Sequence, residues 1–203
     1  MGLEDWDWRD GIQPTLTDEK YYSAPYSIRP SEVDVSIEGF CKAPDTLYIP
    51  NGRIEFVYNN NNDPWTELIY RIWFRVTQQP GETTTPQEGY YIYITPSGVV
   101  LRRQDDGIWK EQETHDLYTD IWDQLDPLAW NWFRVSWWSV AGVGLIVRLE
   151  TKIGNTWCRL CDDFVGFTDM YTDRTYNRVG FRILWISEMN PSYIDNIKIY
   201  KAV

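Results

Sequence analysis

The chain has 203 residues, a length at which one β-sandwich domain can bury enough surface to fold without a disulfide or a metal. Hydrophobic residues make up 43% and charged residues 24%, which excludes wholesale disorder. The net charge of −11 disfavours nucleic acid and anionic membranes as partners, because phosphate groups would be repelled at long range. Aromatic residues are unusually frequent, with 12 Trp and 14 Tyr. We therefore expect one aromatic-rich domain over residues 1–203.

Alternating apolar and polar residues predict β-strands along most of the chain. In chain order, strands are expected at Tyr26–Arg29, Val33–Cys41, Arg53–Asn59, Glu67–Thr77, Tyr90–Thr95, Val99–Arg103, Trp132–Val140, Leu145–Ile153, Val179–Ser187 and Tyr193–Tyr200. One short helix is expected near Asp120–Leu128. Because turns rich in Gly, Pro and Asn connect the strands closely, the pattern predicts an all-β fold, a two-sheet antiparallel β-sandwich of the jelly-roll type with one short helix.

Neither an export signal nor a membrane span is visible in the sequence. The first residues, MGLEDWD, are acidic and lack the basic and apolar regions of a secretory signal. No apolar run approaches the roughly 20 residues of a transmembrane helix. The sequence therefore predicts a protein that does not insert into membranes and is not exported by the Sec route.

The two sides of the expected strands carry different residue types. Side chains alternate between the faces of a sheet, so Ile72, Phe74 and Val76 in the strand Glu67–Thr77 are expected to face the core. Across the strands, the aromatic and arginine side chains expected to point outward are Arg71, Trp73, Arg75, Tyr91, Tyr93, Trp132, Arg134, Trp138, Arg148 and Arg182. If their strands share a sheet, these residues form an Arg/aromatic ladder on its open face.

Such a ladder has two interpretations. Flat rings stack on the apolar faces of sugars, and arginine forks bind hydroxyls or carboxylates, which predicts a glycan-binding face. Alternatively, a loop, a crossing strand or another subunit covers the face, and cation–π pairs stabilise that contact. The residues alone leave both interpretations open.

Short motifs in chain order resemble a known superfamily. The chain opens with LEDW at residues 3–6 and YSAPYSI at 22–28, continues through GYYIYI at 89–94, NWFRV at 131–135 and VGF at 179–181, and closes with YIDNIKIY at 193–200. Together these segments resemble the concanavalin A-like lectin/glucanase (laminin-G-like) jelly rolls over nearly the whole chain. The resemblance implies a concanavalin A-like sandwich whose first and last strands lie side by side.

In that superfamily a calcium ion often lies between the first and last strands. The resemblance implies Glu4 and Asp195 as its ligands here, completed by backbone carbonyls, since Ca²⁺ prefers oxygen. The alternative is that Asp195 forms hydrogen bonds in the terminal hairpin without a metal.

Catalytic motifs are missing from the sequence. Retaining glycosidases need two carboxyl groups about 5–5.5 Å apart, and the Glu-x-Asp-x-x-Glu strand of the glucanase branch does not occur here. The C-x-x-C pair Cys158 and Cys161 would need two more zinc ligands, and only Cys41 and His115 remain, so free cysteines or one disulfide are favoured. We expect a protein that is not an enzyme, with a glycoside hydrolase or polysaccharide lyase as the remaining catalytic alternative.

These inferences predict a non-catalytic, lectin-like protein that works by surface contact. Lectin-like jelly rolls usually act outside cells, and virion proteins reach the outside by lysis. The main hypothesis is therefore a structural component exposed on a virus particle or similar extracellular assembly, of the decoration, turret or spike type. Its expected partners are other subunits of the assembly, copies of itself in a homo-oligomer, and glycans. The alternative function is a carbohydrate-binding module of a cellular glycan-processing system. The alternative location is the cytoplasm, if no assembly carries the protein outside the cell.

Overall fold

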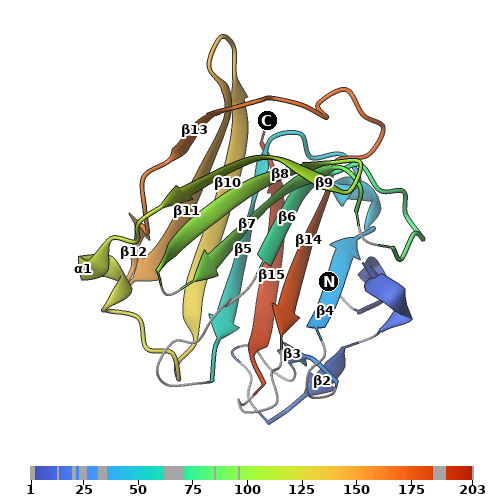
Figure 1. Ribbon diagram of the computed structural model, residues 1–203. Coiled ribbons are helices and arrows are strands. Elements are labelled where there is room, and N and C mark those ends of the chain that lie inside the picture. The colour runs from blue at the N-terminus through green and yellow to red at the C-terminus, as the bar shows by residue number, and fades with distance from the viewer. Residues whose placement is uncertain are drawn as a thin grey trace.

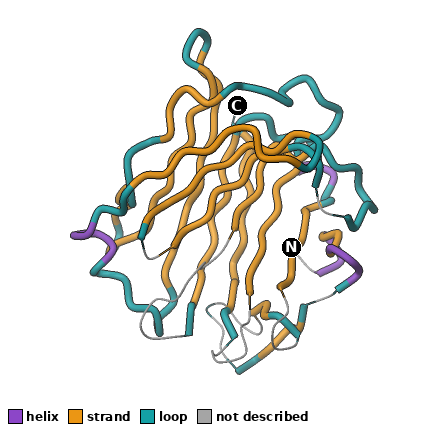
Figure 2. Tube along the Cα trace, viewed as in Figure 1, coloured by secondary structure: helices purple, strands orange, loops and turns teal. Residues whose placement is uncertain are grey.

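Two packed antiparallel β-sheets make up the protein, as the computed structural model in Figures 1 and 2 shows. It describes residues 3–12, 14–19, 22, 27–31, 36–61, 71–84, 86–95, 97–184 and 191–202. The helices in these residues are short, namely α1 (Thr119–Trp122), η1 (Leu3–Asp5), η2 (Arg9–Gly11) and η3 (Pro44–Thr46). None of these helices is long and apolar enough to cross a membrane. The predicted all-β sandwich with one short α-helix is confirmed.

We call the two layers the front sheet and the back sheet. In spatial order, the front sheet consists of β1 (Trp6–Trp8), β4 (Ser36–Cys41), β14 (Arg178–Leu184), β6 (Arg71–Val76), β7 (Gly89–Thr95), β8 (Gly98–Asp105) and β9 (Ile108–His115). The back sheet consists of β12 (Thr156–Arg159), β11 (Gly144–Ile153), β10 (Asn131–Val140), β5 (Gly52–Asn59), β15 (Tyr193–Lys201), β3 (Ser27–Arg29) and β2 (Thr15–Thr17), with β13 (Phe164–Phe167) paired to β11.

Some strands were not expected from the sequence. Strand β9 reads IWKEQETH, which is largely exposed and charged and so lacks the apolar alternation of a half-buried strand. It lies at an edge of the front sheet, where charged side chains discourage pairing with another chain. Strands β1, β2, β12 and β13 have only three or four residues, too few for alternation to show. Of the expected strands, residues 26, 33–35, 67–70 and 185–187 lie outside the described part of the chain.

Aromatic and branched side chains from both sheets form the core between them. The ring of Phe74 stacks on Tyr90 of the same sheet at 5.5 Å and on Trp137 of the opposite sheet at 5.1 Å between ring centroids. The expected core-facing residues found in this core are Ile72, Phe74, Tyr90, Ile92, Ile94, Phe133, Val135, Trp137, Leu145, Val147, Leu149, Val179, Phe181 and Ile183. The alternation therefore predicted the inner faces of the strands correctly.

The prediction fails at the end of β6, where a β-bulge reverses the alternation. Along β14, Gly180 and Arg178 are two residues apart, but their partners Trp73 and Val76 are three apart, so β6 contains an extra residue. Arg75 has a φ of +51°, which a bulge accommodates. As a result, Val76 packs in the outer cluster with Trp73, and Arg75 does not point outward as expected.

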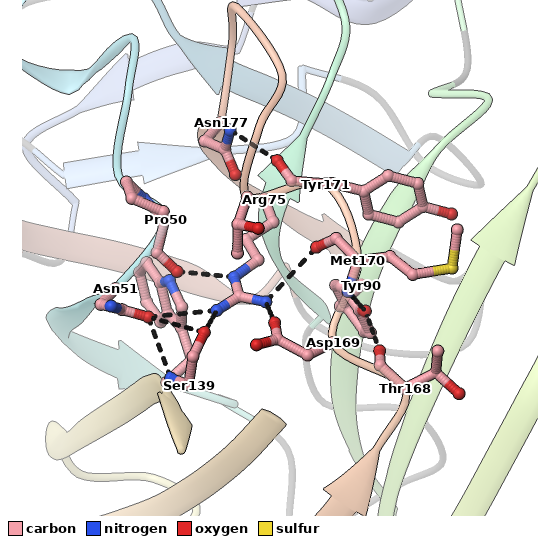
Figure 3. A network of polar contacts seen from close by, with 12 residues as sticks. Pro50, Asn51, Arg75, Tyr90, Ser139, Thr168, Asp169, Met170, Tyr171 and Asn177 are labelled. Carbon is pink, nitrogen blue, oxygen red and sulfur yellow. Dashed lines mark hydrogen bonds and ion pairs between the residues drawn. The ribbon is translucent and has the colours of Figure 1, made fainter. Parts of the chain in front are cut away.

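Arg75 instead points into the space between the sheets and joins them (Figure 3). Its guanidinium donates hydrogen bonds to the carbonyl oxygen of Pro50 at 2.5 Å, to Ser139 Oγ of β10 at 2.7 Å and to Asn51 Oδ1 at 3.1 Å. It also forms an ion pair with Asp169. The Arg75 side chain is fully buried, so its charge is stabilised by these partners rather than by water.

The expectation that the first and last predicted strands lie side by side is confirmed for the described residues. The first predicted strand, Tyr26–Arg29, corresponds to β3, which pairs with the last strand, β15, in the back sheet. The short strand β1, which the sequence did not predict, pairs instead with β4 at an edge of the front sheet.

We predict that Arg75→Ala lowers the free energy of unfolding by about 3–5 kcal/mol, because it removes one partner of a buried ion pair and leaves buried acceptors unpaired. Urea denaturation followed by tryptophan fluorescence measures the change. The matched control is Arg148→Ala, whose partly exposed ion pair with Asp163 on the back sheet contributes about 1 kcal/mol or less. Equal, small effects for both variants would contradict a structural role for Arg75.

Candidate functional site

The residues expected to form one Arg/aromatic ladder lie on two opposite faces of the sandwich. Arg71, Trp73, Tyr91, Tyr93 and Arg182 belong to β6, β7 and β14 of the front sheet, and Trp132, Arg134, Trp138 and Arg148 belong to β10 and β11 of the back sheet. Arg75 lies between the sheets. The single ladder is therefore wrong, because alternation predicts which way a side chain points but not which sheet its strand joins.

An aromatic row crosses the outer face of the front sheet. The strand register places Phe40, Gly180, Trp73, Tyr91, Arg102 and Gln112 next to one another on β4, β14, β6, β7, β8 and β9. The ring centroids of Phe40 and Trp73 are 6.2 Å apart, and those of Trp73 and Tyr91 are 4.4 Å apart. Phe40, Trp73 and Tyr91 are almost completely buried in this outer cluster.

Gly180 allows this row to cross β14. A Cβ atom at Gly180 would overlap the Phe40 ring and lie 2.6 Å from the carbonyl oxygen of Gly39. With no side chain between them, Phe40 on β4 and Trp73 on β6 contact each other over the intervening strand. The aromatic row is therefore a continuous floor rather than two separate pairs.

A second row of residues lies beside the aromatic row and carries the charges. It consists of Glu38, Arg182, Arg71 and Tyr93, which are neighbours on β4, β14, β6 and β7. The guanidinium carbon of Arg71 lies 4.5 Å from the centroid of the Tyr91 ring and 5.8 Å from that of Trp73. We call the two rows together the arginine–aromatic face.

The side chain of Arg102 completes this face toward β9. Its guanidinium carbon lies 3.5 Å from the ring centroid of Trp109 and 5.1 Å from that of Tyr93. It donates hydrogen bonds to Gln112 Oε1 at 2.5 Å and to the Tyr91 hydroxyl at 3.4 Å. Trp109 is 58% exposed and Tyr93 is partly exposed, so both rings are accessible from solvent.

Little negative charge balances these arginines. The carboxylate of Glu38 accepts hydrogen bonds from Trp73 Nε1 at 2.5 Å and from Arg9 at 3.0 Å. Among the described residues, no carboxylate forms an ion pair with Arg71, Arg102 or Arg182, since the ion pairs found there involve other arginines, Lys42 or His115. Burial, reinforced by the positive charge of Arg182, lowers the pKa of Arg71 against the opposing effect of Glu38.

Sequence reasoning missed Glu38, Phe40, Arg102 and Trp109 on this face. The alternation would have found Glu38 and Phe40, which flank the inward-facing Gly39, and Arg102, which follows the core residue Leu101. Trp109 had no such signal, because its strand β9 lacks alternation.

The arginines on the outer face of the back sheet are all paired with carboxylates. Arg134 binds Glu150 at 2.7 Å, and Arg148 binds Asp163 at 2.7 Å. Arg53 binds Glu55 at 3.2 Å beside a hollow of about 420 Å³ that Trp138 and Tyr200 help to line. The side chain of Tyr22 also contacts this face, because Trp132 Nε1 donates a hydrogen bond to its hydroxyl at 3.0 Å. Cation–π contacts accompany these ion pairs, with Arg134 over the Trp157 ring and Arg148 over the Trp138 ring.

The two residues expected to bind calcium are not brought together in a ligand set. Glu4 lies in η1 near the front sheet, and Asp195 lies in β15 of the back sheet. The Asp195 carboxylate accepts hydrogen bonds from the backbone N–H of Tyr22 at 3.0 Å and of Asn196 at 2.5 Å. Within the described residues, no group of three or more His, Cys, Asp or Glu side chains could hold a metal ion. The described positions of Glu4 and Asp195 thus give no support to a shared calcium site, and calcium binding stays a prediction.

The fold belongs to the class of concanavalin A-like jelly rolls found in legume lectin-like domains, which confirms the resemblance seen in the sequence. No protein family model and no curated protein sequence matches the chain.

Three solved structures illustrate the similarity of the fold. A legume lectin-like domain from Entamoeba histolytica has a TM-score of 0.64 at 10% identity, over 99% of this chain and 92% of that one. The carbohydrate recognition domain of Emp46p has a TM-score of 0.64 at 10% identity, over 99% and 90% of the two chains. The exoplasmic/lumenal domain of VIP36, in a form bound to Ca²⁺ and Man3GlcNAc, has a TM-score of 0.60 at 12% identity, over 100% and 86%.

The three cysteines form no disulfide, and they differ in exposure. Cys41 and Cys161 are buried, whereas Cys158 is partly exposed. Burial raises the pKa of Cys41, and it raises the pKa of Cys161 to about 12. Because the thiolate is the reactive form, the two buried thiols should be inert in the folded protein.

We predict that iodoacetamide at pH 8 modifies Cys158 in the folded protein and leaves Cys41 and Cys161 unmodified. Mass spectrometry of intact and digested protein identifies the modified residue. Unfolding in guanidinium chloride before the reaction should make all three thiols react. Rapid modification of Cys161 in the native state would contradict its burial.

Proposed function

We propose that the protein is a non-catalytic lectin that binds glycans on the arginine–aromatic face of the front sheet. One observation carries this proposal, namely that accessible rings and arginine donors without carboxylate partners occur together on this face. The rings of Tyr93 and Trp109 can stack on the apolar face of a sugar, and Arg71, Arg102 and Arg182 can donate hydrogen bonds to its oxygens.

The similar structures support the carbohydrate-binding alternative over the hypothesis of a virion component. VIP36 was solved with mannose and with Man3GlcNAc, and the Emp46p domain is described as a carbohydrate recognition domain. No comparison points to a virus particle. A cellular glycan-binding role therefore replaces the assembly role as our proposal, and the protein's location stays a prediction.

We predict that Tyr93→Ala and Trp109→Ala each weaken glycan binding by roughly tenfold, as expected for the loss of one stacked ring. A glycan array identifies ligands for the wild-type protein, and isothermal titration calorimetry then compares the variants. The matched control is Trp132→Ala, which removes a partly exposed ring from the back sheet and should leave affinity unchanged.

Circular dichroism verifies that each variant is folded, which is expected because the side chains removed are partly exposed. Absence of any glycan signal would contradict the proposal, as would loss of binding in Trp132→Ala alone.

Repeating the titration with Ca²⁺ and with EDTA shows whether glycan binding needs a metal ion. This comparison is motivated by VIP36, which was solved in a Ca²⁺-bound and in a metal-free form. Turnover of a bound glycan would favour the hydrolase or lyase alternative instead.

A further inference from the structure

Arg71 and Arg182 are directly opposite each other on the neighbouring strands β6 and β14. Directly opposed side chains on one face have Cβ atoms about 4.5–5.5 Å apart, and like charges at that spacing destabilise a sheet. The Nε atoms of both arginines are buried and have no hydrogen-bond partner. Apart from the ring contacts of Arg71, these two guanidinium groups have no hydrogen-bond or ion-pair partner among the described residues.

The nearest acidic group compensates for this pair only in part. Glu38 is the cross-strand neighbour of Arg182, but its two carboxylate oxygens are occupied by Trp73 Nε1 and by Arg9. Arg102 adds a further positive charge on the same face, and its side chain donates hydrogen bonds to the neutral groups of Gln112 and Tyr91. The face is therefore locally positive on a chain whose net charge is −11.

The opposite face shows that this imbalance is not a general property of the chain. On the back sheet, Arg53, Arg134 and Arg148 each form an ion pair with a carboxylate at 3.2 Å or less. The arginines on the outer face of the back sheet are thus neutralised by carboxylates. Arg71, Arg102 and Arg182 on the front sheet have no such carboxylate partner.

We infer that the glycans bound by this protein are acidic saccharides, whose negatively charged group is held between Arg71 and Arg182. This inference rests on the proposed function and names its ligand class. A carboxylate or a sulfate ester offers two or more oxygens in the geometry that guanidinium groups bind in pairs. The sugar ring that carries the charged group would then lie against the accessible ring of Tyr93, the next residue in the same cross-strand row.

A matched pair of ligands tests the charge requirement. Oligogalacturonate and its methyl ester have the same sugar rings, and only the first carries carboxylates. We expect wild-type protein to bind the acid at least tenfold more tightly, with affinity falling as salt is raised. A sulfated oligosaccharide and its desulfated form distinguish the second kind of anionic group, and inorganic sulfate alone tests for a simple ion site.

Variants then identify the residues. Arg182→Met and Arg71→Met should each remove the preference for the acid over the ester, and neither should lower the melting temperature, because each relieves a like-charge contact. Arg134→Met on the back sheet is the matched control and should keep the full preference. Arg182→Lys keeps the positive charge but loses the two-pronged hydrogen bonding of the guanidinium group. This variant should therefore retain only part of the preference for the acid.

The outcomes separate this inference from the proposed function. Equal or tighter binding of the neutral ester overturns the acidic specificity and leaves glycan binding intact. If the protein binds no saccharide on the array, acidic or neutral, the proposed function itself is overturned. Full competition by inorganic sulfate at the same concentration as the oligosaccharide would show an ion site without saccharide recognition, and would also overturn the inference.

Discussion

The stack of Phe74 against Tyr90 and Trp137 is the contact on which the rest of the molecule depends. It lies between the two sheets and connects β6 and β7 of the front sheet to β10 of the back sheet. Because side chains alternate along a strand, fixing Phe74 in the core forces Trp73 to the opposite side. The outer aromatic row is thus a consequence of the core packing.

The core could be predicted from the sequence because burial imposes period-two alternation on every long strand. The bulge at Arg75 could not be predicted, because β6 has one extra residue relative to β14 and no change of residue type marks that position. Beyond that point Val76 and Arg75 exchange sides, and an arginine expected on the surface becomes the link between the sheets. One positive φ angle therefore changes the role of a predicted binding residue to a structural one.

The candidate site could be predicted only in part, because it is made by strands that are far apart in the sequence. Strand β14 lies between β4 and β6, which places residues 38, 182 and 71 in one row. Nothing in the local pattern of any of these segments specifies that order. The sequence identified the types of side chain that matter, Trp, Tyr and Arg, whereas the division into a charge-paired face and an unpaired face needed the sheet order.

The net charge of −11 argues against polyanions that approach from a distance, but it does not govern contacts at the arginine–aromatic face. At physiological ionic strength the Debye length is about 8 Å, so distant carboxylates are largely screened from a ligand seated there. The charges within that distance along the sheet are dominated by Arg71, Arg182 and Arg102, while Glu38 is already engaged by Arg9 and Trp73. An acidic protein can therefore have a short-range preference for an acidic saccharide while repelling nucleic acid, whose many phosphates would extend beyond the face.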